Sequence, residues 1–305
     1  MSATKPYGQP VGKPDNHAHS YANLRVRPLA SAMGAEILGV DLAHLDRPTF
    51  VDLTDALYRH KMIFVRDQDL DFAAQENLTA RFGEFGTDAY TAGIPGHPHI
   101  QRVLKRADES APLIFGGSWH TDSPFLDRPP AISVLYGVDI PPYGGDTLWT
   151  NTVQALAALS DTMQTMLRPL RVHMSGRNVL AALHQHAAAG APALASMDIE
   201  LAEQIMLDGA FHPLIRTHPV TGERSLYVDE TYAVGIAGMS DYEAAPLLAF
   251  LCAHVTQPLF QCRLRWEPRT LALWDNRVCL HHAFNDHDGF RREMLRTIVA
   301  GEIPR

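Results

Sequence analysis

The hydrophobic and polar positions of the first quarter of the chain follow two different periods. Residues 24–42 alternate apolar and polar side chains between glycines, which predicts two strands in a hairpin. Residues 47–61 carry apolar side chains at helical spacing and predict an amphipathic helix that begins near Thr49 or Asp52. The apolar stretch 62–68 then predicts a short buried strand. The chain therefore opens with a hairpin, a helix and a strand.

A second helix is predicted over residues 71–85, with Gly83 as its C-terminal stop. Beyond about residue 113 the pattern changes, and short apolar runs such as AISVLYGV and TLALWDN lie between turns rich in proline and glycine. This spacing is typical of a β-sandwich or β-barrel. We therefore predict a mainly β chain with α inserts.

Three segments interrupt the strand pattern. Residues 152–170 have the spacing of a helical insert, and residues 240–255 predict a helix with Ser240 or Asp241 as its N-cap. Residues 181–197 are rich in alanine and have no clear period. We interpret this last segment as a mobile cover over an active site, although a surface loop with a short helix fits its composition equally well.

Composition limits the class of protein. The chain has 305 residues, of which 46% are apolar and 20% charged, as in a soluble globular protein. We expect a flexible leader over residues 1–23 and a single domain over residues 24–305. The net charge of −8 argues against a broad nucleic-acid surface. No apolar run is long enough to span a membrane. We expect a small-molecule substrate, no nucleic-acid or membrane partner, and a homo-oligomer.

The three cysteines are an odd number at unrelated spacings, so they indicate neither a disulfide framework nor a zinc site. A reducing compartment fits this usage best, and we predict a cytoplasmic protein.

The stretch WHTDSPF, residues 119–125, places His120 and Asp122 two positions apart. In an extended strand, side chains at this spacing point to the same face. An isolated pair of this kind is usually a solvated strand edge, so a metal site requires a third ligand. The stretch LWDNRVCLHHAFND offers His281 or His282. Two imidazoles and a carboxylate form the facial triad that binds Fe(II) and leaves positions open, and zinc can take the same ligands.

Two arginines follow the histidine pair. Arg292 and Arg296 are four residues apart, so on a strand both side chains point to the same interior. Two buried guanidinium groups are costly unless anions meet them. Carboxylates are their natural partners, because arginine binds a carboxylate through two parallel hydrogen bonds.

Several separated motifs occur together: RDQ, RFGEF, WHTDSPF with RPP, GGDTLWTN, LYV, and LWDNRVCLHHAFND with FRREMLR. With these motifs the chain, from about residue 24 to its end, resembles the TauD/TfdA family of Fe(II)- and 2-oxoglutarate-dependent dioxygenases. The resemblance implies a double-stranded β-helix, or jelly roll. It also implies Fe(II), 2-oxoglutarate and O₂ as the cofactor and co-substrates.

The resemblance assigns roles to individual residues. Thr147 and Arg292 fall where the family binds the distal carboxylate of 2-oxoglutarate. Arg296 falls where members with anionic substrates hold the acid group, although a structural salt bridge is the alternative. His282 is expected to be a packed or surface residue. The iron ligands that the resemblance implies are His120, Asp122 and His281.

The implied reaction is hydroxylation of a small anionic organic substrate that is aryloxyalkanoate-, sulfonate- or sulfate-like, with release of succinate and CO₂. Cleavage would follow where the hydroxylated carbon carries a leaving group. One alternative is hydroxylation of an amino-acid-like compound or a natural-product intermediate. Two alternatives of other classes are a zinc hydrolase and a non-catalytic 2-oxoglutarate sensor.

The substrate end of the site departs from the taurine-type pattern. Those members carry a histidine and a tyrosine shortly after FGE, where this chain has Asp88 and Tyr90, and the change argues against taurine. Among the types within the family, the chain's motifs most resemble those of the aryloxyalkanoate type. We interpret Asp88 as a solvated loop carboxylate, with contact to a substrate amine as the alternative. Asp229 stands where related chains have asparagine, and the sequence offers no reason. The candidate substrate contacts besides Arg296 are Phe85, Asp88, Tyr90, Ile114, Ser123, Phe125 and Tyr232.

Overall fold

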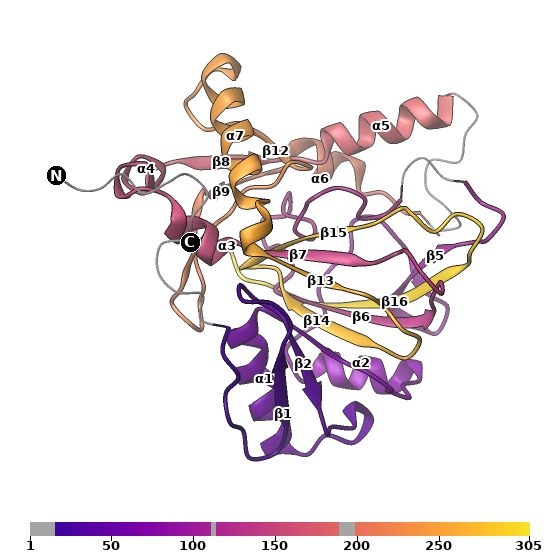
Figure 1. Cartoon of the computed structure of the whole chain (residues 1–305). Coiled ribbons are helices and arrows are strands. Elements are labelled where there is room, and N and C mark those ends of the chain that lie inside the picture. The colour runs from indigo at the N-terminus through magenta and orange to yellow at the C-terminus, as the bar shows by residue number, and fades with distance from the viewer. Residues whose placement is uncertain (1–15, 111–113, 189–198) are drawn as a thin grey trace.

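The computed structural model describes residues 16–110, 114–188 and 199–305, and its scaffold is a large mixed sheet (Figure 1). The strands of this sheet are β1 (Arg25–Pro28), β2 (Ala35–Leu38), β3 (Met62–Val65), β4 (Gly93–Ile94), β5 (His97–Lys105), β6 (Ile132–Asp139), β14 (Leu271–Asp275) and β16 (Arg292–Val299). They lie in the order β1-β2-β3-β14-β6-β16-β5-β4. Neighbouring strands are antiparallel except β2 and β3, which are parallel.

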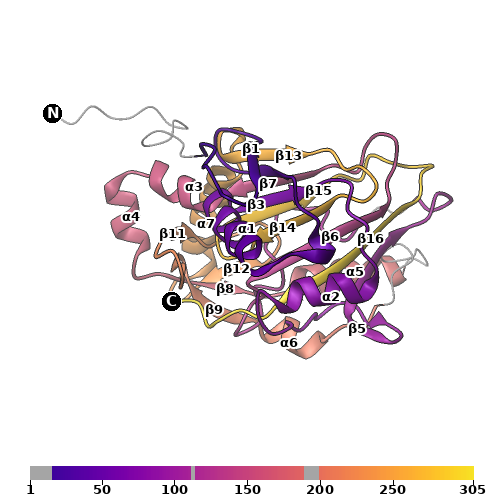
Figure 2. The same ribbon diagram turned by 90° about the horizontal axis from the view of Figure 1, so that it is seen from below.

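A smaller sheet faces the large one. Its strands, in the order β13-β7-β15, are β7 (Thr147–Asn151), β13 (Gln261–Leu264) and β15 (Cys279–Ala283). Trp149 of β7 and Trp274 of β14 are almost fully buried between the two sheets, with ring centroids 5.7 Å apart. Met294 of β16 belongs to the same core. The two sheets thus share one hydrophobic layer, and Figure 2 shows them from below.

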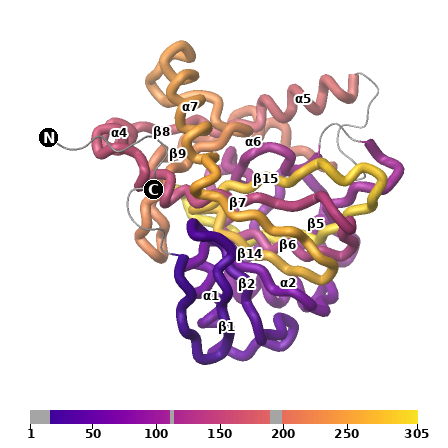
Figure 3. The backbone as a smooth tube through the Cα atoms, in the orientation of Figure 1, coloured from indigo at the N-terminus to yellow at the C-terminus, as the bar shows by residue number. Residues whose placement is uncertain are grey.

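Two helices cover the other face of the large sheet, α1 (Arg47–His60) and α2 (Phe72–Ala80). Because side chains alternate along a strand, each strand of this sheet contributes to two cores. On β3, Ile63 packs with the helix residues Leu53 and Leu78, whereas Phe64 packs toward the smaller sheet. Figure 3 shows the path of the backbone from these helices into the sheet.

The remaining elements pack around a third core at one end of the two sheets. The helices are α3 (Thr152–Ala158), α4 (Asp161–Leu167), α5 (Arg177–Ala188), α6 (Glu203–Asp208) and α7 (Asp241–Val255). The strands are β8 (Arg171–Met174), β9 (Ala210–Pro213), β10 (Ile215–Thr217), β11 (Arg224–Leu226) and β12 (Ala233–Ile236). Short 3-10 helices span Leu42–His44 and Pro258–Phe260. No helix among the described residues is both long and apolar enough to cross a membrane.

Most predicted elements are present, but several boundaries differ. The helix predicted from residue 47 is α1, yet its N-cap is Asp46, whose carboxylate accepts a hydrogen bond of 2.8 Å from the Thr49 N–H. The second helix ends at Ala80, before Gly83. The insert at 152–170 is two helices rather than one, because Ser160 caps a new helix. At α7, Ser240 forms a capping box, as predicted.

The two segments predicted to be mobile are described only in part. Residues 181–188 are the second half of α5, and residues 189–197 lie outside the described residues, so the mobile cover stays a prediction. Residues 1–15 of the predicted leader also lie outside them. The Asn16 amide is buried and donates to the Gly34 carbonyl at 3.0 Å.

Candidate active site

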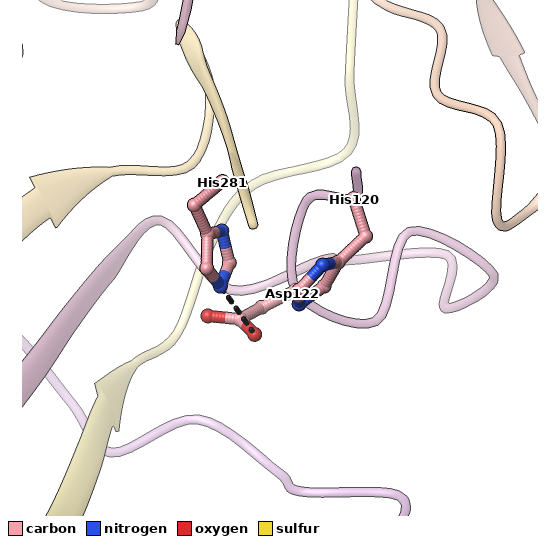
Figure 4. A group of neighbouring side chains, drawn as sticks. All are labelled: His120, Asp122 and His281. Atoms are coloured by element: carbon pink, nitrogen blue, oxygen red, sulfur yellow. Dashed lines mark ion pairs between the residues drawn. The ribbon is translucent and has the colours of Figure 1, made fainter. Parts of the chain in front are cut away.

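His120, Asp122 and His281 meet beside β15, an edge strand of the smaller sheet. Contrary to the predicted strand, residues 119–125 are irregular, and only His120 pairs with β15. The His120 N–H donates to the His281 carbonyl at 3.0 Å, and the His281 N–H donates back at 2.8 Å. This exchange sets the two imidazole centroids 4.0 Å apart. Ligand atoms of all three side chains lie within 4.8 Å of one another, and Figure 4 shows them converging.

The protonation of this group suits a divalent metal ion. Burial lowers the pKa of His120 and holds that of His281 well below its ordinary value, so both imidazoles are neutral at neutral pH. Burial alone would raise the pKa of Asp122, but the charge of Arg296, helped by the hydrogen bond from Ser133, outweighs it and lowers that pKa to about 2. Two neutral nitrogen donors and a carboxylate are the donor set of a non-haem iron site.

Each ligand is oriented differently. The Nδ1 of His120 lies 2.7 Å from the Ser118 carbonyl, so it carries the proton and leaves Nε2 available for a metal. The Nδ1 of His281 has no hydrogen-bond partner among the described residues. His282 points elsewhere and packs its ring against Trp119. Only the first of the two adjacent histidines therefore faces Asp122, at 3.9 Å.

A chain of buried polar side chains holds Asp122. The Ser133 hydroxyl donates to its carboxylate, and the Asn276 amide donates to the Ser133 oxygen at 2.8 Å. The Trp274 indole N–H donates to Asn276 at 2.9 Å. The sequence analysis overlooked Ser133. A serine inside the apolar run AISVLYGV was the available signal.

Arg292 is a buried cation with no counter-ion in contact among the described residues. Its Nε has no hydrogen-bond partner, and none of the described carboxylates lies within ion-pair distance. Burial is the main cause that lowers its pKa to about 10. Gly145 packs so closely that a Cβ there would lie 3.0 Å from the Arg292 Nε. An unpaired guanidinium at this depth is costly, so the position fits the carboxylate of an absent anion.

Thr147 follows the same turn and is buried on β7. Its oxygen accepts a hydrogen bond of 2.9 Å from the Trp266 indole N–H. A hydroxyl both accepts and donates, so the Thr147 proton remains available for a carboxylate oxygen.

Arg296, four residues further along β16, has two carboxylate partners. Its Nη2 lies 2.9 Å from Asp88 and its Nη1 lies 3.2 Å from Asp122. Asp88 is therefore not the solvated loop carboxylate that we expected, because its side chain is only 3% exposed. Its sequence neighbours, Thr87 and Ala89, give no sign of this ion pair, because only the tertiary fold brings Arg296 to it.

A cavity of about 370 Å³ opens above the triad. Five of the predicted substrate contacts line it: Tyr90, Ile114, Ser123, Tyr232 and Arg296. Phe125 is not among the lining residues, since it packs behind Tyr90 and Tyr232 with ring centroids 5.8 and 5.4 Å away. Phe85 does not line the cavity either, because its ring stacks on His99.

The sequence also missed one wall of the cavity. Val179, Ala182 and Leu183 of α5 line it, together with Phe115 from the loop before His120. Their spacing along the helix is three and four residues, which a search for helical periodicity could have found if it had started before residue 181.

Asp229 now has an explanation. Its carboxylate accepts from the Tyr232 N–H at 2.7 Å and from the Thr121 N–H at 3.4 Å. It thus ties a cavity-lining loop to the segment that carries two of the three candidate ligands. Burial raises its pKa to about 7.

Comparison with known proteins identifies the family. Residues 25–298 match the family described as taurine catabolism dioxygenase TauD, TfdA family. The chain belongs to the TauD/TfdA family. It is an Fe(II)- and 2-oxoglutarate-dependent dioxygenase that uses O₂.

Relatives within the TauD/TfdA family cover almost the whole chain. An alpha-ketoglutarate-dependent sulfate ester dioxygenase of Pseudomonas putida is 32% identical over 92% of this chain and 91% of its own. An (S)-phenoxypropionate/alpha-ketoglutarate-dioxygenase of Sphingobium herbicidovorans is 28% identical over 91% and 95%. The crystal structure of a taurine dioxygenase from Burkholderia xenovorans is 33% identical, covers 93% of both chains and superposes with a TM-score of 0.75.

Proposed function

We propose that Fe(II) binds to His120, Asp122 and His281, and that Arg292 and Thr147 hold the distal carboxylate of 2-oxoglutarate. One observation carries the proposal. Strand β16 connects the candidate metal ligands with a buried cation. Its Arg296 contacts Asp122, and its Arg292, four residues earlier, is a buried guanidinium with no counter-ion in contact among the described residues.

The bound metal and 2-oxoglutarate supply the oxidising chemistry, in which one oxygen atom of O₂ enters the substrate and the other enters succinate, with release of CO₂. The protein supplies position. His120 and His281 are held by their backbone exchange, and Ser133 fixes Asp122. The cavity over the triad excludes bulk water from the reacting carbon.

We propose that the substrate is a small organic molecule whose apolar body lies against Phe115 and Leu183 and whose polar end reaches Arg296. The relatives named above act on sulfate esters and on phenoxypropionate, which also combine an organic body with a polar end. Such substrates release a fragment when the hydroxylated carbon bears oxygen. Cleavage after hydroxylation is therefore part of this proposal.

The test is an anaerobic titration followed by a turnover screen. Adding Fe(II) and 2-oxoglutarate without oxygen should produce a visible charge-transfer band, and adding O₂ with a substrate should release succinate above the background without substrate. A zinc hydrolase would give neither result. A sensor would give the band but no substrate-dependent succinate. If iron binds and no band forms, the assignment of the 2-oxoglutarate site is wrong.

We further propose that the two facing sheets form a double-stranded β-helix and that the enzyme works in the cytoplasm, which its three unpaired cysteines support. The homo-oligomer stays a prediction, and sedimentation velocity would test it.

A further inference from the structure

Two charged side chains at the polar end of the cavity, Arg296 and Asp122, are in contact, and Asp88 lies behind them against Arg296 without lining the cavity. The guanidinium lies 3.2 Å from the Asp122 carboxylate and 2.9 Å from that of Asp88. The side chains of Arg296, Asp122 and Asp88 are 6%, 5% and 3% exposed, so solvent screens their interactions little. Arg296 faces the cavity and rests over the Phe115 ring at 4.8 Å.

Hydrogen bonds from three residues hold Asp88 in this position. Its carboxylate accepts hydrogen bonds from the Tyr90 N–H at 3.2 Å and from the Thr91 hydroxyl, besides Arg296. The backbone around it is tied to the strand-like segment after α5, since the Tyr90 carbonyl accepts from the Glu200 N–H at 2.9 Å. The carboxylate cannot turn away from Arg296 without losing these donors.

Arg296 is the only lysine or arginine among the cavity's described lining residues. With the metal and co-substrate of the proposed function in place, the positive charges of a divalent ion and Arg292 equal the negative charges of Asp122 and the 2-oxoglutarate dianion. The positive charge of Arg296 is likewise balanced by the negative charge of Asp88. A substrate anion beside Arg296 would therefore be a buried charge without a counter-ion, which is costly.

We propose that Asp88 determines specificity: it neutralises Arg296 internally, so the preferred substrate presents a polar end of no net charge. This inference rests on the proposed function, because the charge balance includes the metal and 2-oxoglutarate. An amide and an amino-acid zwitterion share the required chemistry. Both can accept a hydrogen bond from Arg296 without bringing a net charge into the cavity, whereas a sulfonate, a sulfate ester or a carboxylate brings a negative charge that Asp88 already supplies.

The test measures binding rather than turnover. The protein loaded with Mn(II) and 2-oxoglutarate is titrated calorimetrically with three probes that share a six-carbon chain: hexanamide, norleucine and hexanesulfonate. Wild type should bind hexanamide or norleucine more tightly than hexanesulfonate. Hexanamide and norleucine both lack net charge, and comparing them separates an uncharged substrate from a zwitterionic one.

Asp88→Asn then tests the cause. The amide oxygen can still accept from Tyr90 or Thr91, but Arg296 loses its counter-charge, so hexanesulfonate affinity should rise by roughly tenfold or more. Glu230→Gln is the matched control. It removes a carboxylate from the rim of the same cavity without unpairing Arg296, and it should change the preference by less than about twofold.

The inference is overturned if wild type binds neither hexanamide nor norleucine more tightly than hexanesulfonate, including the case in which no probe binds. It is also overturned if folded Asp88→Asn binds hexanesulfonate no better than wild type. Failure of the proposed function looks different, because 2-oxoglutarate would then not bind to the Mn(II)-loaded protein before any probe is added.

Discussion

At the scale of single residues, two arginines on one strand differ in every contact. Arg296 is held by Asp88 and Asp122, whereas Arg292 has no ion-pair partner among the described carboxylates and an Nε without a hydrogen bond. A buried guanidinium with no carboxylate in contact is the better candidate for binding an anion. This contrast supports the proposal that Arg292, rather than Arg296, binds the co-substrate.

Replacing Arg292 should therefore affect 2-oxoglutarate above all. Arg292→Ala removes a buried charge-assisted pair, and the dissociation constant for 2-oxoglutarate should rise by roughly tenfold to a hundredfold or more. Arg292→Lys should restore only part of the affinity for 2-oxoglutarate, because lysine keeps the charge but lacks the planar fork of donors. Arg291→Ala is the control, since that exposed neighbour pairs with Asp139 and Glu293. Calorimetry on the Mn(II)-loaded protein measures all three, and an equal loss in the control would refute the assignment.

The adjacent histidines give the second residue-scale prediction. His120→Ala, Asp122→Ala and His281→Ala should each lose high-affinity metal binding, because two remaining ligands hold a divalent ion poorly. His282→Ala should keep it, since that ring packs against Trp119 rather than facing Asp122. Metal content after dialysis, with circular dichroism to confirm folding, separates these outcomes. Loss of metal in His282→Ala alone would show that the strand faces the other way.

At the scale of elements, the sequence predicted what local patterns determine. The hairpin, α1 and the cap of α7 follow from periodicity and from single capping residues. It failed where partners are distant. Residues 119–125 were predicted as a strand, but the one β-bridge that the described residues give them, between His120 and His281, depends on the approach of β15. Asp88 looked solvated because its sequence neighbours carry no sign of Arg296.

The turn between β14 and β15 gives a prediction about pH. Asp275 is buried and accepts from Arg277 at 2.7 Å and from His218 at 2.9 Å. Burial opposes its charge, but Arg277 and His218 outweigh this and hold its pKa below its ordinary value. The stabilisation it provides is present above the unfolded-state pKa of about 4 and is lost as pH falls below it.

Asp275→Asn should lower the free energy of unfolding at pH 7 by about 3 kcal/mol, because it removes the nearer counter-ion of the buried Arg277 and leaves it only Glu302, at 3.7 Å. Its stability should also fall less steeply than that of wild type as pH drops below about 4. Urea unfolding at a series of pH values measures both. Parallel pH profiles for the two proteins would show that Asp275 is not the titrating group.

Helix α5 supplies the second element-scale prediction. Ala182 lines the cavity, and Ala181 beside it is exposed. Ala182→Phe should fill part of the cavity and weaken substrate binding while leaving 2-oxoglutarate binding unchanged, and Ala181→Phe should do neither. Titration with hexanamide and with 2-oxoglutarate provides the measurement. If both variants behave like wild type, α5 does not border the substrate.

At the scale of the whole molecule, the two facing sheets bring together segments that are far apart in sequence. The sequence could predict the class of architecture and the residue types of the centre. It could not predict which side chains fill the space between them, because Ser133, Asn276 and Phe115 acquire their roles only through packing. Removing the metal should therefore lower the stability of the whole fold. A chelator should lower the midpoint of thermal unfolding, and Asp122→Ala, which binds no metal, should not respond.

His120 and His281 exchange backbone hydrogen bonds although about half of the chain separates them in sequence. A metal ion bound to both side chains, as proposed above, would be a reversible cross-link across a very long loop. Its contribution to the free energy of unfolding depends on the concentration of free metal. At a hundred times the dissociation constant the metal adds about 2.7 kcal/mol, and without metal this contribution is absent. Differences of this size change how much of a protein escapes degradation in a cell. The abundance of this enzyme is therefore expected to follow iron availability even where transcription does not change.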